Sequence, residues 1–134
     1  MVPRYLAALL FVVYPPFVSP AHAEHDSGKW DCNGGNMLEI GYCAAERLKH
    51  ADTRLNRVYQ AQQRRLRTEE SKTRLREAQR AWVSFRDKDC LYQAGLPSGS
   101  GWALDDLSCR QVRTEQRIRE LEEYLNCTQN GCPE

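Results

Sequence analysis

Apolar residues recur every three or four positions in three long stretches of this chain, and that period restricts the fold more than any other feature of the sequence. The stretches cover residues 40–67, residues 68–94 and residues 104–125. The positions between the apolar ones are mostly charged, as on the solvent side of an amphipathic helix. Three such helices with short connections predict an all-α, antiparallel up-down-up three-helix bundle.

The ends of these stretches carry helix start and stop signals. Asn36 is followed three positions later by Glu39, which is a capping-box pattern and predicts the start of the first helix. Thr68 and the two glutamates after it predict the start of the second. Residues 95–102 hold three glycines, two serines and a proline and predict the main surface loop. Residues 24–35 lack a period and predict an irregular N-terminal arm.

The first residues look like an export signal. A basic start at Arg4 is followed by a short apolar run and then by Ala21-His22-Ala23, an order that is typical of a cleaved signal peptide. We therefore expect residues 1–23 to be removed and residues 24–134 to form one domain. No cysteine follows the cleavage point directly, so a lipid anchor is not expected. The predicted location is periplasmic or secreted, in a bacterium, and not embedded in a membrane.

All six cysteines follow the predicted cleavage point, and an even number in a short exported chain predicts disulfides. None of their spacings is C-x-x-C, which argues against a thiol oxidoreductase, and oxidised sulfurs do not bind zinc. Cys127 and Cys132 are expected to form a local bridge at the end of the third helix. The pairing of the other four stays open at this point; they are Cys32, Cys43, Cys90 and Cys109.

The formal net charge is only +1, so the protein as a whole has no strong long-range field. Arginines nevertheless concentrate on the first two helices, and there are two interpretations of this basic face. It is either a solvated helix surface or a surface for an anionic envelope polymer or lipid headgroup. Export argues against nucleic acid. The arginines are Arg47, Arg54, Arg57, Arg64, Arg65, Arg67, Arg74, Arg76 and Arg80.

Nothing in the sequence predicts catalysis, a metal site or a cofactor. After the predicted cleavage point the only histidines are His25, in the arm, and His50, and no nucleophile has a recognisable catalytic context. By helical period, carboxylate pairs such as Asp87 and Asp89 are surface charges. We therefore predict a protein that acts by binding and is not an enzyme.

The run from Leu75 to Cys90 is the most distinctive in the chain, and it reads L-x-x-A-Q-x-x-W-x-x-F-R-D-x-x-C. Upstream, Cys43 starts the pattern C-x(8)-D-x-x-L-N-x-x-Y. Downstream, Gly99-Ser100-Gly101 precedes Cys109 and Thr114. Over roughly residues 32–125 these motifs make the chain resemble the family named after the mycobacterial lysozyme inhibitor LprI. The chain differs from the founding member in lacking a lipidation cysteine and in having the additional pair Cys127 and Cys132.

We interpret the residues of this signature as structural. If the first hairpin turns near Thr68, Asp52 faces Arg86 and Asn56 lies near Gln79 and Arg80, so that polar groups hydrogen-bond between helices. Trp82 and Phe85 are expected to fill the core beside them. The residues predicted to specify the fold are Asp52, Asn56, Tyr59, Gln79, Trp82, Phe85, Arg86 and Asp87.

The loop is the candidate for contact with a partner, because Cys90 and Cys109 flank it and limit the entropy lost on binding. The alternative is a plain connection between helices. The candidate contact residues are Lys88, Ser98, Gly99, Ser100, Gly101 and Trp102. The resemblance implies a lysozyme or a related peptidoglycan hydrolase as the partner. The alternatives are an immunity or accessory protein against another wall-targeting effector, or a structural protein that binds envelope polymers. The sequence leaves the oligomeric state open.

Overall fold

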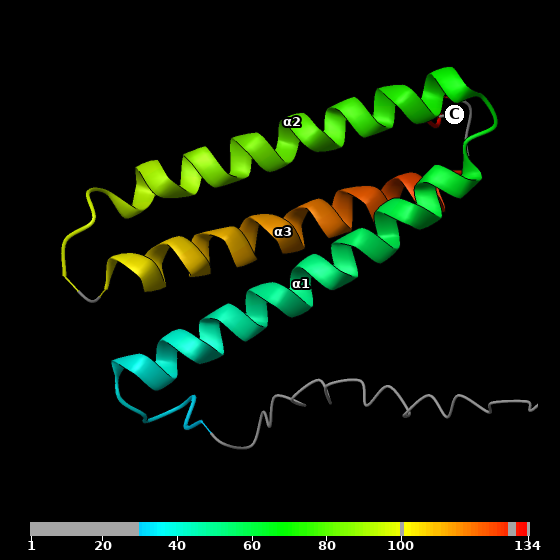
Figure 1. Cartoon of the computed structure of the whole chain (residues 1–134). Coiled ribbons are helices and arrows are strands. Elements are labelled where there is room, and N and C mark those ends of the chain that lie inside the picture. Colours follow the sequence, from blue (N-terminus) through cyan, green and yellow to red (C-terminus); the bar gives the residue numbers. More distant parts are fainter. Residues whose placement is uncertain (1–29, 100, 129–130, 134) are drawn as a thin grey trace, which may run out of the picture.

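The computed structural model describes residues 30–99, 101–128 and 131–133, and three helices form its body (Figure 1). They are α1 (Met37–Arg65), α2 (Glu69–Ala94) and α3 (Trp102–Asn126). They run up, down and up, so the predicted fold class is confirmed. The predicted signal peptide and Ser100 lie outside the described residues.

The predicted caps of the first two helices are present. Asn36 accepts hydrogen bonds from the amides of Leu38 and Glu39, and the Glu39 carboxylate accepts one from the Asn36 amide, which completes a capping box. Thr68 caps α2 through the amide of Ser71. The third helix begins at Trp102, so this residue belongs to α3 and not to the preceding loop.

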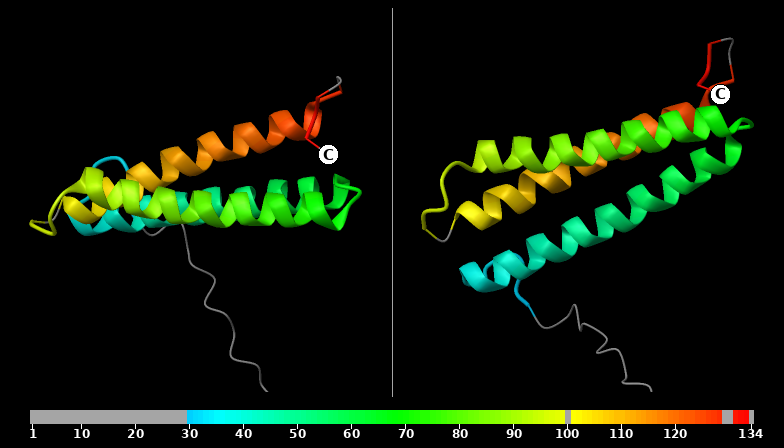
Figure 2. Two further views of the ribbon diagram at one scale, coloured as in Figure 1. Left: turned by 90° about the horizontal axis from the view of Figure 1, so that it is seen from above. Right: turned by 45° about the horizontal axis from the view of Figure 1, so that its top comes forward.

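The third helix lies between the other two and packs against both, whereas α1 and α2 make little direct contact with each other (Figures 1 and 2). The core forms where α3 meets α1, around Leu55, Ile118 and Leu121. Leu75 and Trp82 of α2 pack against this cluster from the other side. The bundle is therefore held together through α3, and a gap remains between α1 and α2.

The prediction that Phe85 fills the core is wrong. Its side chain is 54% exposed, whereas the neighbouring Arg86 is buried. Successive residues of an α-helix point about 100° apart. Because Arg86 points toward α3, Phe85 lies at the margin of the face of α2 that packs on α3. There the guanidinium of Arg113 lies 6.0 Å from the centre of the Phe85 ring. Trp82 is half-buried against the core, as expected.

Three disulfides are present. The bond between Cys32 and Cys43 ties the N-terminal arm to α1, and the bond between Cys90 and Cys109 ties the end of α2 to the start of α3. The third joins Cys127 to Cys132, the local pair that the spacing favours. The first two bonds therefore hold the same end of the bundle, and the third lies beyond the end of α3.

The helices of the described segments show no stretch that is both long enough and apolar enough to cross a bilayer.

The space around Gly35 in the arm can be tested by substitution, with Gly41 of α1 as the comparison. A Cβ at Gly35 would lie 2.3 Å from the Asp31 carbonyl oxygen and 2.4 Å from Glu39 Oε2, the capping carboxylate. Gly35→Ala is therefore expected to cost about 1–3 kcal/mol of unfolding free energy. Gly41 lies within α1 with no atom within 4 Å of an added Cβ, so Gly41→Ala is expected to stabilise by about 0.5–1 kcal/mol. Urea unfolding of both variants checks this, and shifts of the same sign would contradict it.

Candidate functional site

Exposed apolar side chains gather at one end of the bundle. This end, which we call the stapled pole, comprises residues 30–45 of the arm and α1, residues 88–99 and 101 of α2 and its loop, and residues 102–109 of α3 (Figure 1). Of the eight large hydrophobic side chains exposed in the described part of the chain, six lie at this pole. They are Met37, Leu38, Tyr42, Leu91, Tyr92 and Leu96. Three of them belong to α1 and three to α2 and its loop, and exposed apolar groups of this size are typical of surfaces that bind another protein.

The loop between α2 and α3 projects apolar groups into solvent. Tyr92 is 84% exposed and Leu96 is 85% exposed. The chain turns at Gly95 and Gly99, whose φ angles of 77° and 74° suit glycine. At the base of the loop, Trp102 Nε1 donates a hydrogen bond of 2.9 Å to the Gly95 carbonyl oxygen. With the Cys90–Cys109 bond, this contact holds the two ends of the loop together.

The α1 side of the pole contains an apolar groove of about 430 Å³ between the starts of α1 and α3. Met37, Leu38 and Tyr42 line it from α1, and Leu104 and Leu107 line it from α3. The Tyr42 ring also stacks on Trp30 of the arm, with ring centres 4.6 Å apart. The groove is thus bordered by an aromatic pair that fixes the arm against α1.

A turn in the arm precedes this groove. The Asn33 and Gly34 amides each donate a hydrogen bond of 3.0 Å to Asp31 Oδ1. These two bonds lower the pKa of the Asp31 carboxyl below its ordinary value, and the bond from Asn33 has the larger effect. Because the folded pKa lies below the unfolded one, the stabilisation is fully present above the unfolded pKa and is lost as the pH falls through the folded pKa.

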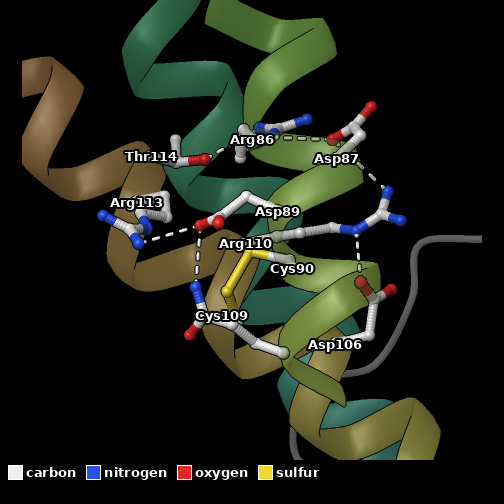
Figure 3. Close-up of a disulfide and its surroundings, with 10 residues drawn as sticks. Arg86, Asp87, Asp89, Cys90, Asp106, Cys109, Arg110, Arg113 and Thr114 are labelled. Atoms are coloured by element: carbon white, nitrogen blue, oxygen red, sulfur yellow. Dashed lines mark hydrogen bonds and ion pairs between the residues drawn. A yellow bond between two sulfur atoms is a disulfide. The ribbon is translucent and has the colours of Figure 1, made fainter. Parts of the chain in front are cut away.

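Behind the pole, polar side chains join α2 to α3 around the Cys90–Cys109 bond (Figure 3). Arg86 is the centre of this network: its Nη1 lies 2.7 Å from Asp52 Oδ1 and 2.8 Å from Thr114 Oγ1, and its Nε lies 2.9 Å from Asp87 Oδ1. Arg110 reaches the same oxygen of Asp87, at 3.5 Å. The R-D-x-x-C part of the signature thus contacts α3 through all three of its fixed residues.

Two further ion pairs extend this network. Arg113 Nη2 lies 2.8 Å from Asp89 Oδ2, and Arg110 Nε lies 2.9 Å from Asp106 Oδ1 (Figure 3). Asp87 and Asp89 therefore both take part in contacts between helices. The prediction of a plain surface charge is wrong for Asp89, whereas Asp87 was also predicted among the residues that specify the fold. Their partners come from α3, whose rotation about its axis cannot be read from the α2 motif alone.

The remaining signature residues face the gap between α1 and α2. Asp52, Asn56 and Tyr59 line it from α1, and Gln79 lines it from α2 together with Arg80. Asn56 thus lies on the same groove as Gln79 and Arg80, as the hairpin register predicts. No hydrogen bond joins Asn56 to any residue that the structure describes, so Asn56 forms no polar bridge to Gln79 or Arg80.

The predicted contact residues differ in their exposure. Lys88 is exposed one turn before Tyr92 on the same face of α2, and Ser98 and Gly99 are exposed in the loop. Gly101 and Trp102 are half-buried, because they form the base of the loop. Sequence reasoning did not single out Tyr92 and Leu96, which the structure exposes. An apolar residue shortly before Gly95 and another between Gly95 and Pro97, where a loop is predicted, are the signal that indicates them.

All nine arginines of the predicted basic face are exposed. Arg54 pairs with Glu122 at 3.2 Å and Arg74 with Glu70 at 2.5 Å. Arg65 donates hydrogen bonds to the carbonyl oxygens of Tyr124 and Cys127, at the C-terminal end of α3. The basic face is therefore partly engaged in contacts within the bundle. Within the described ranges no group of histidine, cysteine, aspartate or glutamate side chains is arranged to hold a metal ion.

A comparison with protein families gives the context for this geometry. The model of the family described as "Lysozyme inhibitor LprI" matches residues 31–121, which is more than half of the chain. The chain belongs to the LprI family. The match covers α1, α2 and most of α3 together with four of the six cysteines, whereas Cys127 and Cys132 lie outside it. No curated protein and no solved structure matches the chain.

For the LprI signature, the structure gives a physical division of roles. Arg86, Asp87 and Cys90 fasten α2 to α3, and Asp52 completes this contact from α1. Asn56, by contrast, faces the open groove, and Gln79 lines that groove while it accepts a hydrogen bond from Arg117 of α3.

Proposed function

We propose that this protein acts outside the cytoplasm, after removal of residues 1–23, and inhibits a lysozyme or a related peptidoglycan hydrolase. Family membership supports the class of target. The three disulfides suit an oxidising compartment. Inhibition results from occupation of the target enzyme's cleft and involves no catalysis by the inhibitor itself.

The observation that carries this proposal is the concentration of exposed apolar side chains at the stapled pole. Binding energy at protein interfaces comes from a few buried anchors, often aromatic, with a polar rim around them. Tyr92 and Leu96 have the exposure of such anchors, and Lys88 and Ser98 flank them as polar groups. The disulfide between Cys90 and Cys109 and the Trp102–Gly95 hydrogen bond pre-organise the loop, which lowers the entropic cost of binding.

The cleft of a lysozyme contains two catalytic carboxylates. A loop that enters this cleft with Leu96 and Ser98 at its tip blocks the substrate sterically. The Lys88 ammonium group and the Ser98 hydroxyl are the groups of the pole suited to contact those carboxylates, since one is a cation and the other a hydrogen-bond donor.

The test is the clearing of cell-wall suspensions by c-type, g-type and i-type lysozymes, with and without the oxidised protein. We expect slower clearing by at least one class, and a Tyr92→Ala/Leu96→Ala variant to need at least about ten times more protein for the same effect, about 1.4 kcal/mol. Val112→Ala removes an exposed apolar group away from the pole and is the matched control. Equal loss in the control, or normal clearing by all three enzymes, would refute the proposal.

The dependence of inhibition on salt concentration distinguishes binding through the stapled pole from binding through the basic face. Inhibition through apolar anchors is expected to persist at moderate ionic strength, whereas attraction by exposed arginines weakens as charges are screened. A Lys88→Ala/Ser98→Ala variant that inhibits as well as the unaltered protein would show that these two groups do not contact the catalytic carboxylates.

A further inference from the structure

The gap between α1 and α2 forms an open groove of about 530 Å³ on a different face from the stapled pole. Its α1 wall is formed by Asp52, Asn56 and Tyr59, and its α2 wall by Arg76, Gln79 and Arg80. Pockets for small ligands have volumes of about 300–1,000 Å³. The groove therefore has the size of a small-molecule site.

Positive charge dominates this groove. At its base Arg86 and Asp52 neutralise each other through an ion pair of 2.7 Å. Arg76 and Arg80 are exposed one turn apart, and neither forms an ion pair with any residue in the described ranges. Arg76 Nη2 donates to the Thr73 hydroxyl at 2.8 Å. After the hydrogen bond from Lys72, the charge of Arg76 is among the causes that lower the pKa of the exposed Glu69. Two guanidinium groups are thus available on one wall, and guanidinium is the side chain best suited to bind carboxylate or phosphate.

Neutral hydrogen-bonding groups complete the groove. Tyr59 Oη accepts a hydrogen bond from Gln63 Nε2 at 2.9 Å, which leaves its own hydroxyl proton to donate. Gln79 Oε1 accepts from Arg117 Nε at 3.2 Å, which leaves the amide nitrogen. The Asn56 side chain is exposed and bonds to none of the described residues. Together these groups provide donors and acceptors for hydroxyl or amide groups beside the arginines.

We propose that the α1–α2 groove binds a small anionic saccharide. Its carboxylate or phosphate lies at Arg76 and Arg80, and its hydroxyl or amide groups contact Asn56, Tyr59 and Gln79. The size argues for a small ligand over a protein, because residues 52–59 of α1 span only about 10 Å, whereas a stable protein interface buries about 800 Å² on each partner. This site is separate from the proposed inhibitory surface.

The test is a titration of the full mature chain, residues 24–134, followed by ¹H–¹⁵N NMR. The probes are a disaccharide-tripeptide from peptidoglycan, which carries carboxylates, glucose 6-phosphate, and neutral chitotriose. We expect saturable shifts in residues 52–59 and 76–86 with at least one of the charged probes and at least tenfold weaker binding of chitotriose. Which charged probe binds more tightly identifies the anion. Equal binding of chitotriose, or no binding of either charged probe at millimolar concentration, would overturn the proposal.

Variants distinguish binding in the groove from nonspecific electrostatic attraction to the exposed arginines. Arg76→Gln/Arg80→Gln is expected to weaken binding of the charged saccharide at least tenfold without changing the circular dichroism spectrum, since both side chains are exposed. The matched control is Arg57→Gln/Arg64→Gln, which removes two exposed arginines of α1 that do not line the groove. Asn56→Ala is expected to weaken binding of the saccharide without changing its dependence on salt. An equal loss in the control would mean that the arginines act only as a diffuse positive surface and would overturn the proposal.

Discussion

Replacing Arg86 by alanine is expected to lower the free energy of unfolding by about 3 kcal/mol, because this guanidinium joins all three helices. It donates to Asp52 of α1, Asp87 of α2 and Thr114 of α3, over 2.7–2.9 Å. Thr114 is fully buried, so its hydroxyl loses a partner that water does not replace. Losing one partner of a buried ion pair costs about 3–5 kcal/mol, and the lower end applies since both carboxylates reach solvent.

Urea unfolding followed by circular dichroism measures this effect. Arg74→Ala is the control, because Arg74 and Glu70 form an exposed ion pair and its loss is expected to change the unfolding free energy by no more than about 0.5 kcal/mol. Arg86→Met keeps the aliphatic stem beside Trp82 and separates packing from polar contacts. A loss below about 1 kcal/mol for Arg86→Ala would show that the network does not fasten α2 to α3.

The three helices and the starts of the first two could be predicted because their signals are local. The capping box at Asn36 and the cap at Thr68 depend on residues within one turn, and the apolar period marks the stripe that becomes buried. The start of the third helix was placed too late. Gly101 provides no side-chain cap, so the sequence has no local signal at that point.

Contacts between α1 and α2 could also be predicted in part, because a short hairpin fixes their register. The ion pair between Asp52 and Arg86 follows from it. Contacts with α3 could not be predicted in the same way, since a longer loop leaves the rotation and tilt of that helix undetermined. For this reason Thr114 and Arg110 were not predicted as partners of the signature residues, and Phe85 was wrongly assigned to the core.

The candidate site, too, could be predicted from the sequence only in part. The loop was predicted from its glycines, serines and proline, and the structure provides the exposed Tyr92 and Leu96 beside it. The groove between α1 and α2 was not predicted, because the apolar period of each helix does not show how closely two helices of a bundle approach each other. It exists because each of these helices packs mainly on α3. Asn56, which was interpreted as a bridge between helices, consequently lines an open surface, and Gln79 lines it as well while it bonds to Arg117 of α3.

Removing the bond between Cys90 and Cys109, by replacing both with serine, is expected to lower the free energy of unfolding by about 3 kcal/mol. The two residues are separated by 19 positions, so the bond restricts a long segment of the unfolded chain. Cys90 is also fully buried, and serine there adds a polar group to the interior. Urea unfolding measures the loss, and hydrogen exchange is expected to increase first at the end of α2 and the start of α3.

The pair Cys127 and Cys132 provides the matched comparison, because it closes a segment with a separation of only 5 positions. Its replacement by serine is expected to cost about 2 kcal/mol in the same chain-entropy treatment. It lies beyond α3, away from the stapled pole, so cell-wall clearing assays should show undiminished inhibition for this variant and reduced inhibition for the Cys90→Ser/Cys109→Ser variant. If both variants inhibit equally well, the bond at the base of the loop does not pre-organise the contact surface, and the loop binds by adapting to its target.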